Sequence, residues 1–168
     1  MDPTAHYRQL ARLGRAAFLG AAAPAALLRY RTPRPGDDLD TAAATLTLDE
    51  PVRAGVSAGA PAAEAVLEVV PLLKKPGAAY PDRITVGRTS NNDVVLPDHA
   101  VSRLHVYFRV REGRWFVADA GSKNGATVDG VVLAPRKEQA LVGAERLRLG
   151  ELELRFVLAE ALYELLRS

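Results

Sequence analysis

A succession of short apolar runs, each closed by turn residues, constrains the fold of this chain more than any other feature. Within residues 65–157 no helical period appears, and several runs alternate apolar with polar side chains, as strands with one buried face do. Pairs such as Asn124-Gly125 and Asp129-Gly130 favour tight turns between them. We therefore expect a mainly β protein, an antiparallel β-sandwich. The expected strands are 66–73, 84–86, 94–96, 104–110, 115–118, 127–128, 131–133, 146–149 and 152–156.

The remaining residues divide into three further segments. Residues 1–30 are rich in Ala, Leu and Arg, and we expect a helical segment that begins at Thr4 and bends at Pro24. Residues 31–64 are acidic and rich in Pro and Gly, which is typical of a linker. The sandwich domain then spans 65–157. Residues 158–168 carry leucines on one stripe and predict a short amphipathic C-terminal helix.

Composition narrows the class of function. The chain has no cysteine, which excludes disulfides and thiolate metal sites and fits a reducing cytoplasm. A net charge of +2, without a run of Lys and Arg, argues against a nucleic-acid partner. The apolar stretch 16–28 is too short to span a membrane, and we prefer a docking helix there over a secretory signal. The alanine- and arginine-rich usage indicates a GC-rich bacterial genome.

The residues with binding chemistry lie between the expected strands. Loops that alternate along a sandwich can gather at one end of the fold. Three such loops would then present three cations, one hydroxyl and one amide, with no acid among them. This set suits a phosphate group, which carries about −1.5 to −2 charges at neutral pH. Its members are Arg88, Ser102, Arg103, Lys123 and Asn124.

These loops resemble, in order and spacing, the forkhead-associated (FHA) domain family over roughly residues 66–157. The motifs that carry the resemblance are Gly87-Arg88, Asn92-Asp93-Val94-Val95-Leu96, Ser102-Arg103-Leu104-His105, Gly121-Ser122-Lys123-Asn124-Gly125 and Val128-Asp129-Gly130. The resemblance implies an eleven-stranded β-sandwich that binds phosphothreonine peptides through loops at one end. It also implies no catalytic activity and no cofactor.

The resemblance assigns a role to each loop residue. Arg88 would donate a pair of charge-assisted bonds to the phosphate, for which its planar fork is suited. Ser102 would donate its hydroxyl to the phosphate, and Arg103 would add positive charge. Asn124 would hold the peptide backbone through its amide. Lys123 stands where some members carry threonine, so a longer cation replaces a hydroxyl at this position.

Three further residues would support the binding loops. They are Gly87, His105 and Gly125. A lone histidine on an apolar strand is more often structural than catalytic, and in the family this one braces the loops. We expect no catalytic residue and no metal ligand. Asp129, if it lies near the peptide groove, would disfavour acidic peptides.

The sequence therefore predicts an adaptor that binds phosphothreonine in partners modified by Ser/Thr kinases. The alternative is an FHA-like scaffold or assembly subunit that acts through phosphorylation-independent contacts, with the N-terminal helix docking on a partner or a membrane. Self-association through the N-terminal region is a further hypothesis. Thr41 follows Asp37-Asp38-Leu39-Asp40 and would bind the domain in cis or in a second copy once phosphorylated.

Overall fold

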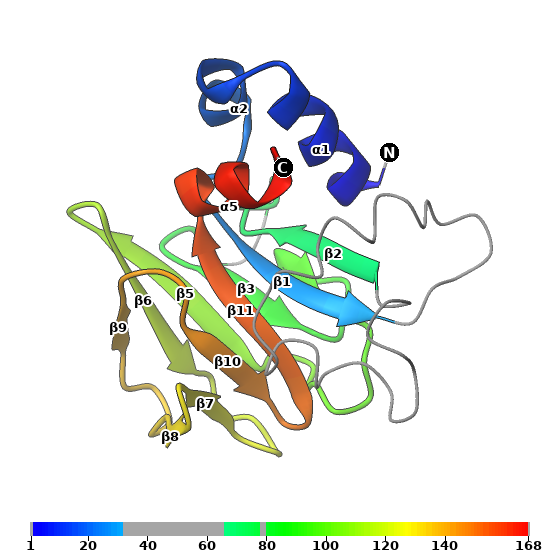
Figure 1. Cartoon of the computed structure of the whole chain (residues 1–168). Helices are drawn as coiled ribbons and strands as arrows, with labels where there is room; N and C mark the ends of the chain where they lie inside the picture. Colours follow the sequence, from blue (N-terminus) through cyan, green and yellow to red (C-terminus); the bar gives the residue numbers. More distant parts are fainter. Residues whose placement is uncertain (1, 32–65, 78–79, 168) are drawn as a thin grey trace. The chain divides into compact units, whose positions relative to one another are not determined.

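The computed structural model describes residues 2–31, 66–77 and 80–167 (Figure 1). The chain forms two compact units, one of residues 1–71 with 153–168 and the other of residues 72–152. The described residues form eleven strands and three helices. The strands belong to two sheets. Among the pairings between described strands, all but one are antiparallel. The predicted mainly β fold class is therefore confirmed.

The first unit is a three-stranded antiparallel sheet with helices on one face. The central strand β1 (Ala25–Arg31) pairs with β2 (Val66–Pro71) on one side and with β11 (Leu152–Leu158) on the other. The helices α1 (Pro3–Arg12), α2 (Arg15–Ala21) and α5 (Ala159–Leu166) gather at this sheet (Figure 1). The predicted C-terminal helix is present as α5.

The expectation that residues 1–30 are helical throughout is wrong for β1. This strand follows α2 after Pro24 and is the middle strand of its unit. Residues 25–28 are all buried, so both faces of the strand are covered and no alternation of apolar and polar residues appears. A continuous apolar run of this kind cannot be distinguished from a buried helix by periodicity.

The helical part also begins and breaks at other residues than expected. Asp2, not Thr4, caps α1, because its carboxylate accepts hydrogen bonds from the amides of Thr4 and Ala5. The hydroxyl of Thr4 is buried and accepts a hydrogen bond from the amide of Val69 on β2 at 2.9 Å. The break between α1 and α2 occurs at Gly14, whose φ of 108° suits glycine.

The second unit contains the other eight strands. One group has the order β4-β3-β5-β6-β9 and a second has the order β10-β7-β8. The strands β3 and β4 pair in parallel. Their bounds are β3 Ile84–Gly87, β4 Val94–Val95, β5 Val106–Arg111, β6 Arg114–Asp119, β7 Ala126–Val128, β8 Val131–Val132, β9 Gln139–Leu141 and β10 Arg146–Leu149. The strand β9 was not predicted, because only Leu141 of its three residues is buried.

The apolar residues predicted to alternate do form the core of this unit. Leu147 and Leu149 of β10 are buried, while Arg146 and Arg148, which alternate with them, are exposed. The linker predicted at 31–64 and the hypothesis on Thr41 fall on residues outside the described ones, except Arg31, which ends β1.

None of the helices in the described segments is long and apolar enough to cross a membrane.

Phe18 offers a test of the first unit. Its side chain is fully buried, and its ring lies 5.8 Å from that of Tyr7 and 5.5 Å from that of Tyr163, so it joins α2 to α1 and α5. Phe18→Ala should lower the free energy of unfolding by about 3–5 kcal/mol because it leaves a cavity. Leu13→Ala, at a side chain that is 67% exposed, should change it by less than about 0.5 kcal/mol. Denaturant titration of both variants measures the difference, and equal losses would contradict this packing.

Candidate functional site

Three loops of the second unit meet at Ser102. They follow β3, β4 and β6, and span residues 88–93, 96–105 and 120–125. The carbonyl of Ser102 accepts a hydrogen bond from the amide of Arg88 at 2.9 Å, and its hydroxyl oxygen accepts one from the amide of Lys123 at 3.0 Å. All five residues expected to bind phosphate or peptide therefore lie on adjoining loops.

The Ser102 hydroxyl is oriented by its contact with Lys123. The side chain is half-buried, and its oxygen already accepts the amide of Lys123. A hydroxyl has one proton to donate, and in the described residues Ser102 gives it to no protein acceptor. The hydroxyl proton is therefore available to a ligand, while the amide of Lys123 is not.

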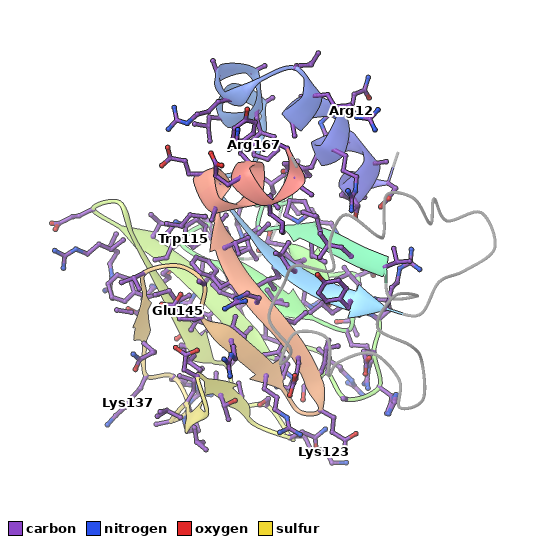
Figure 2. The ribbon with its side chains drawn as sticks, in the orientation of Figure 1. Arg12, Trp115, Lys123, Lys137, Glu145 and Arg167 are labelled. Carbon is purple, nitrogen blue, oxygen red and sulfur yellow. The ribbon has the colours of Figure 1, made fainter. Side chains whose placement is uncertain are left out.

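Three cations lie on the loops that meet at Ser102. Arg88, Arg103 and Lys123 are exposed, and none of their side chains has an ion pair or hydrogen bond within the described part of the chain. Lys123 lies on the exposed loop before β7 (Figure 2). Unpaired cations on converging loops create a positive potential, so the site attracts anions.

Asn124 carries an amide with free hydrogen-bonding capacity. It is exposed, and its Nδ2 donates to the carbonyl of Ala100 at 3.2 Å. That bond uses one of two amide protons and leaves the other proton and Oδ1 unused. A peptide backbone, with its own N–H and C=O groups, matches both.

His105 joins the second and third loops. It is fully buried, its Nδ1 accepts the amide of Ser102 at 3.0 Å, and its Nε2 lies 2.8 Å from the carbonyl of Gly125. An acceptor at Nδ1 and a donor at Nε2 together require the neutral ring with its proton on Nε2. Both ring nitrogens are occupied, which leaves none for catalysis or a metal ion.

The carbonyl of Arg103 joins the first two loops. It accepts the side-chain amide of Asn92 at 2.5 Å, and it lies where a side chain on Gly87 would be. A Cβ built at Gly87 would be 2.0 Å from this oxygen, which is closer than any real contact. Asn92, which is 2% exposed, also donates to the carbonyl of Thr89 at 2.9 Å. Sequence reasoning quoted Asn92 only as part of a motif and gave it no role.

Asp93 anchors the loop that carries Arg88. Its side chain is fully buried and accepts hydrogen bonds from Lys74 Nζ, the Lys75 amide and the Thr85 amide, each at 2.8 Å. Lys75 Nζ also donates to the carbonyl of Ser90 at 2.7 Å. The segment after β2 thus holds the loop after β3 in place. Sequence reasoning missed this role because the partners lie 18 and 19 residues apart and share no local pattern.

Two acids of this unit, Asp119 and Asp129, accept hydrogen bonds from main-chain amides. Asp119 is buried and accepts the amides of Gly121 and Ser122 at 2.7 Å and the hydroxyl of Ser122 at 2.8 Å, so it caps the turn after β6. Asp129 directly follows β7, whereas Asn124 precedes that strand. Its carboxylate accepts a hydrogen bond from the amide of Arg146 at 2.9 Å. The expectation that Asp129 would disfavour acidic peptides stays a prediction.

Gly87→Ala tests the contact between the first two loops. The added methyl group would collide with the carbonyl of Arg103, so the variant should lose roughly 1–3 kcal/mol of stability and weaken any ligand bound at Ser102. Gly20→Ala is the control, because Gly20 lies in α2 with no atom within 4 Å and should gain about 0.5–1 kcal/mol. Thermal unfolding of both variants gives the sign, and a stable Gly87→Ala would contradict the geometry.

Asp93→Asn tests the anchor. Burial raises the pKa of Asp93, but hydrogen bonds from Lys74, Thr85 and Lys75 outweigh it and hold the pKa below its ordinary value of 3.8. Stability from a depressed pKa is present above about pH 4 and is lost as pH falls through the folded-state pKa. The variant should lose about 1–3 kcal/mol at pH 7, and the difference should shrink below pH 4. Urea titrations from pH 7 to pH 2.5 measure both, and a difference independent of pH would refute the assignment.

One protein-family model matches the chain at residues 78–160, and it is described as the cytoplasmic domain of an inner-membrane component of the type III secretion system. The matched segment contains all three loops of the site. Lys74 and Lys75, which hold Asp93, lie just ahead of it.

Two named groups of curated relatives match less than half of the chain. The oxoglutarate dehydrogenase inhibitor of Corynebacterium efficiens is 38% identical over 77 residues, which cover 46% of this chain and 52% of that protein. The glycogen accumulation regulator GarA of Mycolicibacterium smegmatis is 33% identical over 73 residues, 44% of each. The chain spans about half the length of the curated relatives it matches.

Solved structures align with the chain as well. One comes from an analysis of phosphothreonine-dependent FHA domain interactions, with 21% identity over 80% of this chain and 96% of that one and a TM-score of 0.46. Another is EmbR of Mycobacterium tuberculosis in complex with a low-affinity phosphopeptide, with 26% identity over 46% of this chain and 20% of that one and a TM-score of 0.42. The segment matched by the family model, residues 78–160, contains the motifs that resemble the forkhead-associated domain family.

Proposed function

We propose that the loops around Ser102 bind a phosphorylated peptide. The observation that carries this proposal is the Ser102 hydroxyl, whose proton is unused while unpaired cations lie on the loops beside it. A phosphate monoester brings about two negative charges and three acceptor oxygens, which this set of donors matches.

Each residue then has a distinct part in binding. Arg88 donates a bidentate pair of bonds to the phosphate, and Ser102 donates its hydroxyl. Arg103 and Lys123 add charge, and Asn124 holds the main chain of the peptide. Gly87, His105 and Gly125 keep the three loops together through the close approach and the hydrogen bonds described above.

The preference for phosphothreonine rests on the resemblance to the forkhead-associated family, because the charges alone would accept any phosphate. The domain, with boundaries proposed at 65–157, would act as a cytoplasmic adaptor for partners that a Ser/Thr kinase has modified. It would work by binding, without catalysis or a cofactor. The names of the relatives, an inhibitor and a regulator, support a regulatory role.

A second candidate is phosphorylation-independent assembly, which the description of the matching family model favours. In that case the N-terminal residues 1–30 would dock on a partner or on a second copy. A peptide titration separates the two functions, because a scaffold would not distinguish phosphorylated from unmodified peptides. Sedimentation of the intact chain before and after kinase treatment tests self-association, which a constant mass would exclude.

Arg88→Ala is the direct test of the phosphopeptide site. A hydrogen bond to a charged group contributes about 1.5–3 kcal/mol, so losing this side chain should weaken phosphothreonine peptides by roughly 10- to 100-fold or more. Isothermal titration with a phosphothreonine peptide library gives the affinities. The same titration names the preferred motif.

Arg114→Ala provides the matched control. Arg114 is an exposed arginine at the end of β6 opposite to Asp119, and it should bind peptide like the natural chain. Unfolding curves should show both variants fully folded. Equal affinities for Arg88→Ala and Arg114→Ala, or a natural chain that prefers unmodified peptides, would refute the proposal.

A further inference from the structure

The turn after β10 packs against the loop that carries Asn124. The amide of Gly150 donates to the carbonyl of Gly125 at 3.0 Å. A Cβ built on Gly150 would be 2.6 Å from the carbonyl oxygen of Ala100 and 3.2 Å from the Cβ of Asn124. The main chain of this turn therefore lies directly beside Asn124.

Arg148 is tied to the same turn. It is exposed on β10, and its Nε donates to the carbonyl of Gly150 at 3.0 Å, so its side chain runs along the strand toward the turn. Its terminal amino groups have no ion pair or hydrogen bond within the described part of the protein. A guanidinium held at one nitrogen and free at the other two is prepared to bind an anion.

Successive contacts link this guanidinium to the phosphate site through Asn124. They run through Arg88, Ser102, Lys123, Asn124, Gly150 and Arg148. A peptide whose phosphate lies at Ser102 and whose backbone lies at Asn124 would pass next to the turn.

Two acids beside this turn, Asp98 and Glu151, make no ion pair with Arg148 in the described residues. Asp98 uses its Oδ1 to accept the amide of Ala100 at 2.9 Å. Glu151 is exposed in the turn itself and makes no ion pair with Arg148. Neither carboxylate therefore competes directly for the free amino groups.

We propose that Arg148 forms a second anionic subsite, which accepts an acidic side chain of the peptide that passes Asn124. The inference rests on the proposed function, because it concerns the same bound peptide. It adds a specificity element on a strand outside the three loops. The effect is modest, because Arg148 is exposed, and exposed ion pairs are worth about a two- to five-fold change in affinity.

The test is a titration with phosphothreonine peptides in which one Glu is moved through each position on both sides of the phosphothreonine. All other flanking residues are Ala, and a second series carries Lys in place of Glu. The natural chain should bind one Glu peptide about two- to five-fold more tightly than the all-Ala phosphopeptide. The gain should disappear in 0.5 M salt, because exposed pairs are screened.

Variants of β10 decide whether Arg148 is responsible. Arg148→Ala should remove the gain, and Arg148→Glu should transfer it to the Lys peptide at that position. Arg146→Ala is the matched control, because Arg146 is exposed on the same face of β10, roughly 7 Å farther from the turn, and should keep the gain.

The outcomes separate this inference from the proposed function. Binding of the all-Ala phosphopeptide with no Glu preference, or a preference that survives in Arg148→Glu, would overturn the subsite and leave the phosphate site standing. Failure of the natural chain to bind any phosphopeptide would overturn the proposed function and the subsite with it.

Discussion

The carbonyl oxygen of Arg103 is the point on which the site depends. This oxygen accepts a hydrogen bond from the side-chain amide of Asn92, which lies on the neighbouring loop. The two loops come this close only because Gly87 has no side chain. Because the main chain of Arg103 is fixed, the neighbouring Ser102 is fixed as well. The amide of Arg88 donates to the carbonyl of Ser102, and this hydrogen bond positions Arg88.

Buried and exposed polar groups in this site therefore have different tasks. Asn92, Asp93 and His105 are buried, and each finds its hydrogen-bond partners within the protein. They determine where the loops lie. The cations are exposed and unpaired, so water satisfies them until an anion arrives. Because hydrogen bonds already fix these loops, the binding of an anion does not have to offset the entropy cost of ordering the backbone.

How much the sequence predicted varies from strand to strand and from loop to loop. The alternation around Leu147 and Leu149 predicted β10, and turn pairs such as Asn124-Gly125 predicted where strands end. The strand β1 was not predicted from the sequence because both of its faces are buried. The three binding loops were found by motif order, whereas the anchor at Asp93 was not. Its partners come from Lys74, Lys75 and Thr85, and nothing local in the sequence indicates that a strand pairing brings them together.

The same distinction explains why Arg88 and Arg148 should differ in strength. Arg88 follows a strand end that Asp93, Asn92 and Gly87 hold in place, and it shares its ligand with the Ser102 hydroxyl and two other cations. Within the described residues, the side chain of Arg148 makes one hydrogen bond, to the carbonyl of Gly150. A solvated arginine with a single tether gains little from one carboxylate, because the charge pair stays in water and ordering both side chains costs entropy. Affinity should therefore come from the phosphate, and the weaker contact at Arg148 should select among phosphorylated peptides without binding unmodified ones.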